Sequence, residues 1–246
     1  MPILAYHKVD NKFEFGLTNV RPKSFVAQVN ALVERDFRIV GSPENAQKNP
    51  KEICLTFDDA YDCFYRNVNP YLTLNKMKAV VFAISEYVGH SNDWDIRLSR
   101  RSFSHMTASQ LREISELGFE VGSHTCTHRD LTALDAPALK NELVNSRKRL
   151  EDIVGRPVRY LSFPFGRHNA AVVAAAREAG YTGLFGLGSR VRPGVFERVP
   201  VYRIDTVAST SRKASLNRAE IFKSDLIHSF AYISAITSSW RTGKDS

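Results

Sequence analysis

Short apolar segments alternate with longer segments of helical periodicity along most of this chain, and this alternation restricts the possible folds more than any other feature. The apolar segments, rich in β-branched and aromatic residues, are residues 3–6, 37–40, 53–57, 79–84, 119–122, 160–163, 182–185 and 199–204. Strands that are apolar along their whole length are typical of a parallel sheet covered by helices. The pattern therefore predicts an α/β fold, and the periodicity alone is compatible with a barrel or an open sheet.

Four of the intervening segments begin with a side chain that is suited to cap a helix. Ser24 would cap a helix that runs to about residue 35, and Thr107, with Gln110 in capping-box spacing, would cap one that stops at Gly118. Asp135 would cap a helix that ends near Gly155, and Asn169 one that ends at residue 179.

The chain of 246 residues is long enough for one domain with a sizeable core. Residues 1–205 carry the alternation and are expected to form that domain. From residue 206 onward Ser and Thr are frequent and strand signals are rare. Residues 206–246 are predicted to form a helical, basic extension that packs on the same domain.

Composition narrows the function classes. The net charge is +8, but Lys and Arg are scattered, and no nucleic-acid-binding motif accompanies them, so a nucleic-acid partner is not favoured. The three cysteines have no spacing typical of a disulfide framework. No apolar run approaches the ~20 residues that span a bilayer, and the first residues lack the pattern of a signal peptide. We therefore expect a cytoplasmic protein, with peripheral membrane attachment as the alternative.

Two adjacent carboxylates, Asp58 and Asp59, directly follow the predicted strand 53–57. Two ionised carboxylates at the end of a buried strand repel each other, and a bound cation is the simplest compensation. In α/β folds of this kind, the carboxyl ends of the strands face the active site. The alternative is that one of the two Asp residues caps the next helix, from residue 60 onward, and the other is solvated.

Two histidines, His124 and His128, follow the predicted strand 119–122 with three residues between them. Such a pair can reach one metal ion from a turn. An extended segment would place Cys126 on the same face, whereas a helical turn would point it away. Two imidazoles and one carboxylate with open positions are typical of a catalytic metal site, and the spare carboxylate can act as a general base. The alternative is two unrelated histidines.

A third segment ends the predicted strand 160–163 in a turn, with the sequence Phe163-Pro164-Phe165-Gly166. Aromatic residues at such a rim can form an apolar wall for a sugar or an acetyl methyl group. Trp94, in a polar segment that follows a strand, is a further candidate contact. The alternatives are a core strand with a Pro-Gly stop and a partly buried Trp anchor.

These segments together resemble the polysaccharide deacetylases, the NodB-like carbohydrate esterases. T-F-D-D-A at residues 56–60 is close to their T-F-D-D-G motif, S-H-T-C-T-H at 123–128 matches S-H-[ST]-x-x-H, and F-P-F-G at 163–166 resembles the third motif. The resemblance covers roughly residues 1–205 and implies a distorted, incomplete (β/α) barrel.

The resemblance also implies the roles of individual residues. Asp58 would be the catalytic base, and Asp59, His124 and His128 would hold one divalent metal ion, Zn²⁺ before others. Residues 5–7, Ala-Tyr-His, resemble the branch of the family with an N-terminal Tyr-His pair, which implies that His7 is the general acid.

The sequence departs from the family pattern in three places. Ala60 replaces the glycine of the first motif. Ser162 or its neighbours stand where many members carry an arginine that orients the catalytic Asp, and Arg159 or Arg167 are the candidate substitutes. No late Leu-x-His motif follows, since His228 lies in a helical context.

The function that the resemblance implies is the hydrolytic removal of an acetyl group from an N-acetylated sugar, polysaccharide or glycan precursor. Inside a cell, a lipid-linked or nucleotide-linked precursor is the better candidate, and Arg97, Arg100 and Arg101 could meet its phosphate. The alternatives are a metal-dependent amidohydrolase that acts on a small non-sugar amide and a catalytically impaired carbohydrate-binding relative.

Overall fold

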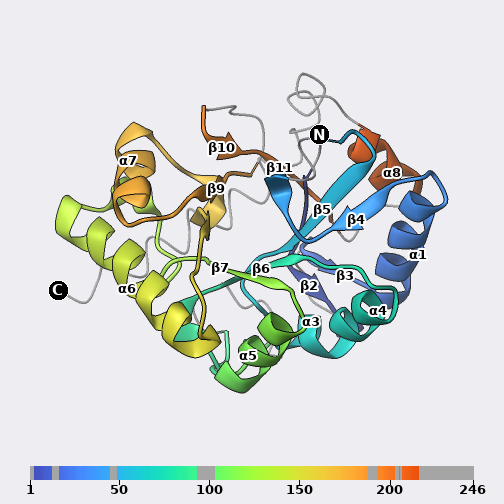
Figure 1. Ribbon diagram of the computed structural model, residues 1–246, viewed down its shortest axis with the longest axis horizontal. Coiled ribbons are helices and arrows are strands. Elements are labelled where there is room, and N and C mark those ends of the chain that lie inside the picture. The colour runs from blue at the N-terminus through green and yellow to red at the C-terminus, as the bar shows by residue number, and fades with distance from the viewer. Residues whose placement is uncertain are drawn as a thin grey trace.

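The computed structural model describes residues 3–12, 17–44, 49–92, 103–187, 193–202, 205 and 207–215. They form one parallel sheet of nine strands that curls almost into a barrel, with helices around the outside (Figure 1). The α/β prediction is confirmed, and the barrel replaces the open sheet. Its strands are β1 (Ile3–Tyr6), β4 (Arg38–Val40), β5 (Glu52–Phe57), β6 (Val80–Ala83), β7 (Glu120–Ser123), β8 (Tyr160–Ser162), β9 (Gly183–Phe185), β10 (Val195–Phe196) and β11 (Arg198–Pro200).

The strand order is β10-β9-β8-β7-β6-β5-β1-β11, with β4 paired to β5 beside this path. The two strands at the ends of the order, β10 and β11, are consecutive in the chain, and Glu197 alone separates them. The chain therefore crosses from one edge of the sheet to the other in a single step, which brings the two edges together. A separate pair, β2 (Lys8–Val9) and β3 (Asn19–Val20), lies beside the barrel.

Helices cover the outer face of the sheet. Figure 1 shows α6 and α7 at one side of the barrel, α3, α4 and α5 along a second side, and α1 and α8 at the side opposite α6 and α7. Their bounds are α1 (Pro22–Val33), α3 (Asp62–Asn67), α4 (Asn69–Leu74), α5 (Ala108–Glu116), α6 (Ala136–Val154), α7 (Ala170–Glu178) and α8 (Val207–Ser215), with short 3₁₀ turns at Ser85–Tyr87, Leu131–Ala133 and Pro164–Gly166. No described helix combines the length and the apolar character that crossing a membrane requires.

Three of the four predicted helix caps are confirmed. Thr107 forms the full capping box with Gln110, and the Asp135 and Asn169 side chains each accept a backbone N–H of the first turn. The prediction for Ser24 is wrong, because α1 begins at Pro22. A proline is favoured at the first helical position, where its missing N–H would have no partner in the helix.

The inside of the barrel is filled by side chains from alternate positions of the strands. They form a cluster of Ile3, Cys54, Val80, Phe82, Tyr160 and Phe185, separate from the larger core between sheet and helices. Gly122 makes room for this filling, since a Cβ there would lie 2.6 Å from the Phe82 ring. The three cysteines are buried free thiols.

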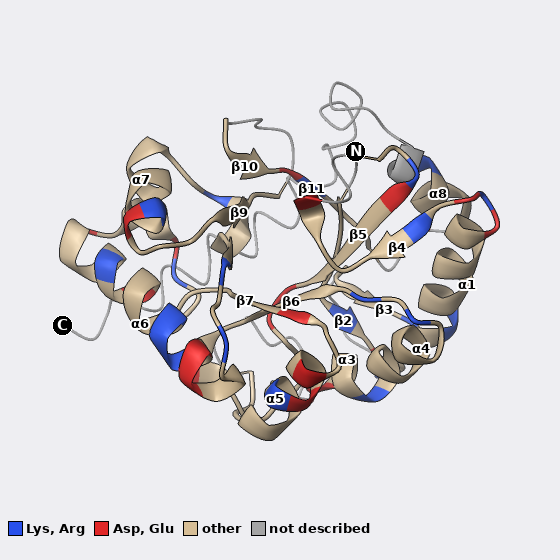
Figure 2. Cartoon of the chain, viewed as in Figure 1, with Lys and Arg blue, Asp and Glu red and all other residues tan. Residues whose placement is uncertain are grey.

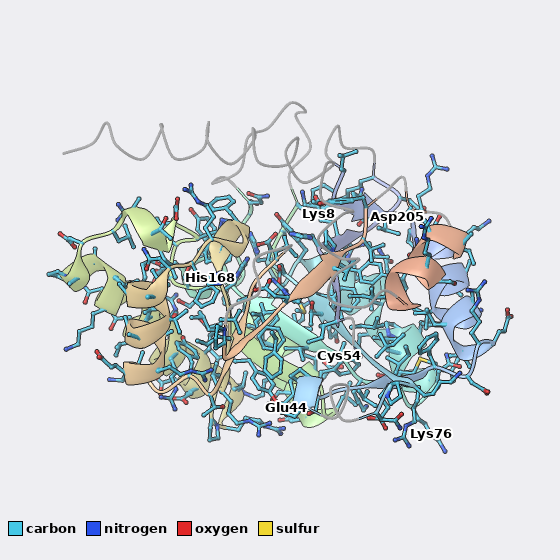
Figure 3. The ribbon with its side chains drawn as sticks, turned by 90° about the horizontal axis from the view of Figure 1, so that it is seen from above. Lys8, Glu44, Cys54, Lys76, His168 and Asp205 are labelled. Carbon is cyan, nitrogen blue, oxygen red and sulfur yellow. The ribbon has the colours of Figure 1, made fainter. Side chains whose placement is uncertain are left out.

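The two ends of the barrel differ. In Figure 3, Lys8, which follows β1, lies toward the upper side, whereas Lys76, which precedes β6, lies toward the lower side, with Cys54 of β5 between them. The carboxyl ends of the parallel strands therefore open on the upper side. Figure 2 shows segments with Lys or Arg interspersed with segments with Asp or Glu on α5, α6 and α7.

Candidate metal centre and its neighbours

The turn that follows β5 presents the two carboxylates. Asp59 and Ala60 both have left-handed backbone conformations, with φ of 67° and 49°. Such conformations are unfavourable for residues with a Cβ and persist only where neighbours hold them. The Asp59 carbonyl lies 2.6 Å from Nδ1 of His105, and the Ala60 carbonyl accepts the N–H of Met106. Ala60 thus adopts the conformation for which the family motif has glycine.

The loop after β7 presents the two histidines. It is neither a regular helical turn nor an extended segment, because Thr125 and His128 both have positive φ, at 71° and 62°. The imidazoles of His124 and His128 meet with their ring centroids 4.7 Å apart. Cys126 does not join them: its thiol points toward the carbonyl of Asn141, 3.7 Å away. The question about Cys126 that the sequence left open is therefore answered.

The structure brings Asp59, His124 and His128 together in one buried cluster. One ligand atom from each lies within 4.8 Å of the others. Asp59 Oδ1 is 3.6 Å from Nε2 of His124 and 3.7 Å from Nε2 of His128. Ligand atoms that share a tetrahedral ion at about 2.1 Å lie about 3.4 Å from one another, so these separations fit a common ion.

The protonation of His124 supports the same fit. Its Nδ1 lies 2.8 Å from the carbonyl oxygen of Ser162, which can only accept, so Nδ1 carries the proton and Nε2 presents a lone pair. Burial lowers the pKa of His124, and it lowers the pKa of His128 further. Neutral imidazole nitrogens and one carboxylate oxygen are donors that suit zinc or a similar divalent ion.

Asp58 lies beside this cluster, and an arginine that is distant from it in the sequence binds its carboxylate. Arg198 of β11 is fully buried, and its Nη1 and Nη2 donate to the two carboxylate oxygens of Asp58 at 2.6 and 2.9 Å. Burial alone would raise the pKa of Asp58, but the charge and hydrogen bonds of Arg198, together with His124 and His7, outweigh burial and hold that pKa below its ordinary value. Asp58 is therefore ionised at neutral pH.

Arg198 corrects the prediction that Arg159 or Arg167 would orient Asp58. Arg159 pairs with Glu120 at 2.9 Å, and Arg167 pairs with Asp130 at 2.5 Å. The sequence signal for Arg198 was weak, since a single arginine at the start of an apolar strand does not reveal which way it points.

His7 follows β1 and also lies near Asp58. Its Nε2 is 4.0 Å from Asp58 Oδ2, and about a fifth of its side chain is exposed. Burial lowers the pKa of His7 to about 4, although the charge of Asp58 acts in the opposite direction. The resting imidazole is therefore neutral at pH 7.

The turn after β8, residues 163–166, places one of its two aromatic rings in the core and the other beside the metal cluster. Phe165, with φ of 57°, places its ring against His128 at a centroid distance of 4.7 Å. Phe163 is fully buried in the main core, so its ring offers no surface to a substrate, contrary to the prediction for this residue. Pro164 is buried, and Gly166 has φ of 66° in a position where a Cβ would collide with Leu187.

An open groove of about 490 Å³ adjoins the histidine loop. Its lining residues are Glu86, Tyr87, His90, Ser91 and Thr127. The mixture of an aromatic ring and polar side chains suits a sugar. Trp94, Arg97, Arg100, Arg101 and His228 all lie outside the described residues.

Comparison with known proteins gives matches along most of the chain. Residues 45–184 match the family described as polysaccharide deacetylase. The chain is 28% identical over 206 residues to YxkH of Bacillus subtilis (strain 168), itself assigned to the polysaccharide deacetylases, and the match covers 80% of this chain and 67% of YxkH. It is 29% identical over 134 residues to the peptidoglycan-N-acetylglucosamine deacetylase of Bacillus cereus, covering 54% of this chain and 55% of that enzyme. The chain thus spans about half the length of that enzyme.

Solved structures share the fold. The deacetylase PplD of Streptococcus pyogenes, in complex with acetate, superposes with a TM-score of 0.74 at 20% identity, covering 87% of this chain and 97% of PplD. IcaB of Ammonifex degensii superposes with a TM-score of 0.71 at 24% identity, with the same coverage.

Proposed function

Because this chain belongs to the polysaccharide deacetylase family, whose members are hydrolases that remove acetyl groups from carbohydrates, we propose that it is a zinc-dependent de-N-acetylase of an N-acetylated sugar polymer or glycan precursor. The observation that carries this proposal is the juxtaposition of two sites. The buried cluster of Asp59, His124 and His128 fits a divalent cation, and an ionised carboxylate, Asp58, stands beside it.

Asp59, His124 and His128 would hold the metal ion. Bound there, the ion would act as a Lewis acid toward the acetamide carbonyl and would lower the pKa of water. The protein's own contribution begins with Asp58, which accepts the proton of the attacking water. Arg198 occupies both Asp58 oxygens from one side and so fixes the direction in which the carboxylate can accept this proton.

His7 would deliver a proton to the departing amine. Since the resting imidazole is neutral, it can donate only after it has gained a proton. The nearest source is the proton that Asp58 takes from water, because Asp58 Oδ2 is 4.0 Å from His7 Nε2. Asp58 and His7 would thus pass one proton from the nucleophile to the leaving group.

The substrate proposal rests on the surroundings of the cluster. The ring of Phe165 lies against His128 and can contact the acetyl methyl group. The groove beside Thr127 can receive a sugar next to the reacting one. A lipid-linked or nucleotide-linked precursor remains our proposal for the form of the substrate, and a small non-sugar amide is the competing class.

The test compares two substitutions by zinc content and by acetate release from N-acetylglucosamine oligomers. Asp58→Asn should retain zinc and lose at least about 10²-fold in kcat, because the base is gone. His124→Ala should lose both zinc and activity, because a ligand is gone. Full activity in either purified variant would contradict the proposal, and release of acetate from small amides alone would favour the competing class.

A further inference from the structure

The loop that carries both histidines is held by a carboxylate from α6. Glu142 is buried, and its Oε2 accepts the backbone N–H of Cys126 at 2.8 Å and that of Thr127 at 3.0 Å. Its Oε1 accepts the hydroxyl of Thr127. Nothing in the activity itself requires this residue, and it is not one of the sequence motifs.

Every backbone N–H from His124 to His128 has a partner, and Glu142 provides two of the five. The others go to the Ala83 carbonyl, to the Ser123 hydroxyl and to the Thr125 hydroxyl, all neutral acceptors within the loop or the adjacent strand. Among the acceptors of these five N–H groups only Glu142 is charged, and it acts on two of the three residues between the histidines.

The loop needs such support because its backbone is strained. Thr125 and His128 have positive φ values that side-chain-bearing residues adopt only when neighbouring contacts hold them. Successive N–H groups that converge in such a turn form a concave site for an anion. Without the Glu142 oxygen, which an amide oxygen could replace, the N–H groups of Cys126 and Thr127 would lack an acceptor in the protein, and the turn would relax toward a conformation in which the histidines no longer face Asp59.

A second contact from the same helix face strengthens the placement. Ser146, one turn after Glu142, lies with its hydroxyl 2.9 Å from that of Ser123, the residue before His124. The residue before the histidine loop and two residues within it are thus attached to α6. We propose that Glu142 is a positioning residue that sets the metal affinity by fixing the loop between His124 and His128.

This inference rests on the metal site of the proposed function, and metal binding by itself tests it. Glu142→Ala should weaken Zn²⁺ binding about 10- to 100-fold, the usual effect of losing a residue that orients a ligand. Glu142→Gln should retain most of the affinity, because both N–H bonds go to one oxygen, which an amide also has, while its NH₂ can face the Thr127 hydroxyl. Affinity is measured by chelator competition, and the absorption spectrum of the Co²⁺-loaded protein reports the ligand geometry.

The matched control is Glu151→Ala. Glu151 lies on the same helix and also accepts a backbone N–H, that of Val158, together with the Arg147 side chain, but it does not touch the loop. Both alanine variants lose an acceptor of a backbone N–H, and only Glu142→Ala should change zinc affinity and the Co²⁺ spectrum.

Wild-type zinc affinity in Glu142→Ala would overturn the inference, and so would an equal loss in Glu142→Gln, because charge alone would then explain it. If Glu142→Ala does not fold, Glu142→Asp takes its place: one methylene shorter, it should also weaken binding, and an unchanged affinity would overturn the inference. Failure of the wild-type protein to bind zinc would instead contradict the proposed function.

Discussion

Replacing Arg198 by methionine should destabilise the protein in a pH-dependent way. The guanidinium has five N–H groups, and all five are used, by Gly186, Thr56, Ser162 and the two oxygens of Asp58. Removing one partner of such a buried ion pair leaves an uncompensated charge, which costs about 3–5 kcal/mol.

The protonation of Asp58 sets an upper limit to this cost. A stranded carboxylate can escape by taking up a proton, and at pH 7 this costs about 4 kcal/mol for a group with an ordinary pKa of about 3.9. At pH 5 the same escape costs only about 1.5 kcal/mol. The destabilisation by Arg198→Met should therefore be about 4 kcal/mol at pH 7 and roughly a third of that at pH 5.

The direction of this pH dependence follows from the pKa of Asp58 in the folded wild type and in the folded variant. In the wild type the Asp58 pKa is lowered, so the pair's contribution is fully present above about pH 4 and is lost as the pH falls below it. In the variant, burial loses its strongest opposing interaction and raises the Asp58 pKa, so stability falls as the pH rises above about 4. Activity should follow, since Asp58 would be protonated and unable to act as a base at pH values where the wild type works.

Urea unfolding followed by circular dichroism, with EDTA present to remove any metal contribution, measures both values. Arg159→Met is the control: its ion pair with Glu120 is half-exposed, and such pairs contribute about 0–1 kcal/mol. Adding Asp58→Asn to Arg198→Met should recover most of the loss. A loss below about 1 kcal/mol at pH 7, or equal losses at pH 5 and pH 7, would refute the role of Arg198 in neutralising a buried charge.

Three further predictions concern the metal site, His7 and the barrel interior. Chelating the metal should lower the thermal midpoint, since a ligand at about 1,000 times its Kd stabilises the folded state by about 4 kcal/mol, and an unchanged midpoint in calorimetry would exclude a tightly bound ion. His7→Ala should lower kcat about 10²- to 10⁴-fold on acetamides and much less on an aryl acetate, whose leaving group needs no proton; equal losses on both would argue against a general acid. Gly122→Ala should destabilise by about 1–3 kcal/mol in urea, because its Cβ would meet the Phe82 ring at 2.6 Å; no loss would mean that the barrel interior has room to spare.

The parts of the site that lie next to strand ends could be predicted from the sequence. Asp58, Asp59, His124 and His128 each follow a strand whose apolar run is visible, and parallel strands bring their carboxyl ends to one side. Local sequence patterns are therefore enough to predict these four residues as one site, because all folds of this class bring the carboxyl ends of their strands together.

The contacts that depend on register or closure could not be predicted. Arg198 is 140 residues from Asp58 in the chain, and only the closure of the barrel makes them neighbours. Phe163 and Phe165 are two residues apart and would share a face if the strand continued. The positive φ of Phe165 ends that alternation and sends the two rings to different places, one to the core and one to His128.

The single-residue crossing at Glu197 has a consequence for when the domain becomes competent. Asp58, Asp59 and the histidine loop all belong to the stretch that is synthesised and can pair long before β11 exists. The Arg198 guanidinium reaches Asp58 only when β11 has formed and paired with β1. A partly folded chain could thus bring the three metal ligands together while Asp58 still lacked Arg198. Asp58 gains its ion pair only in the step that closes the barrel.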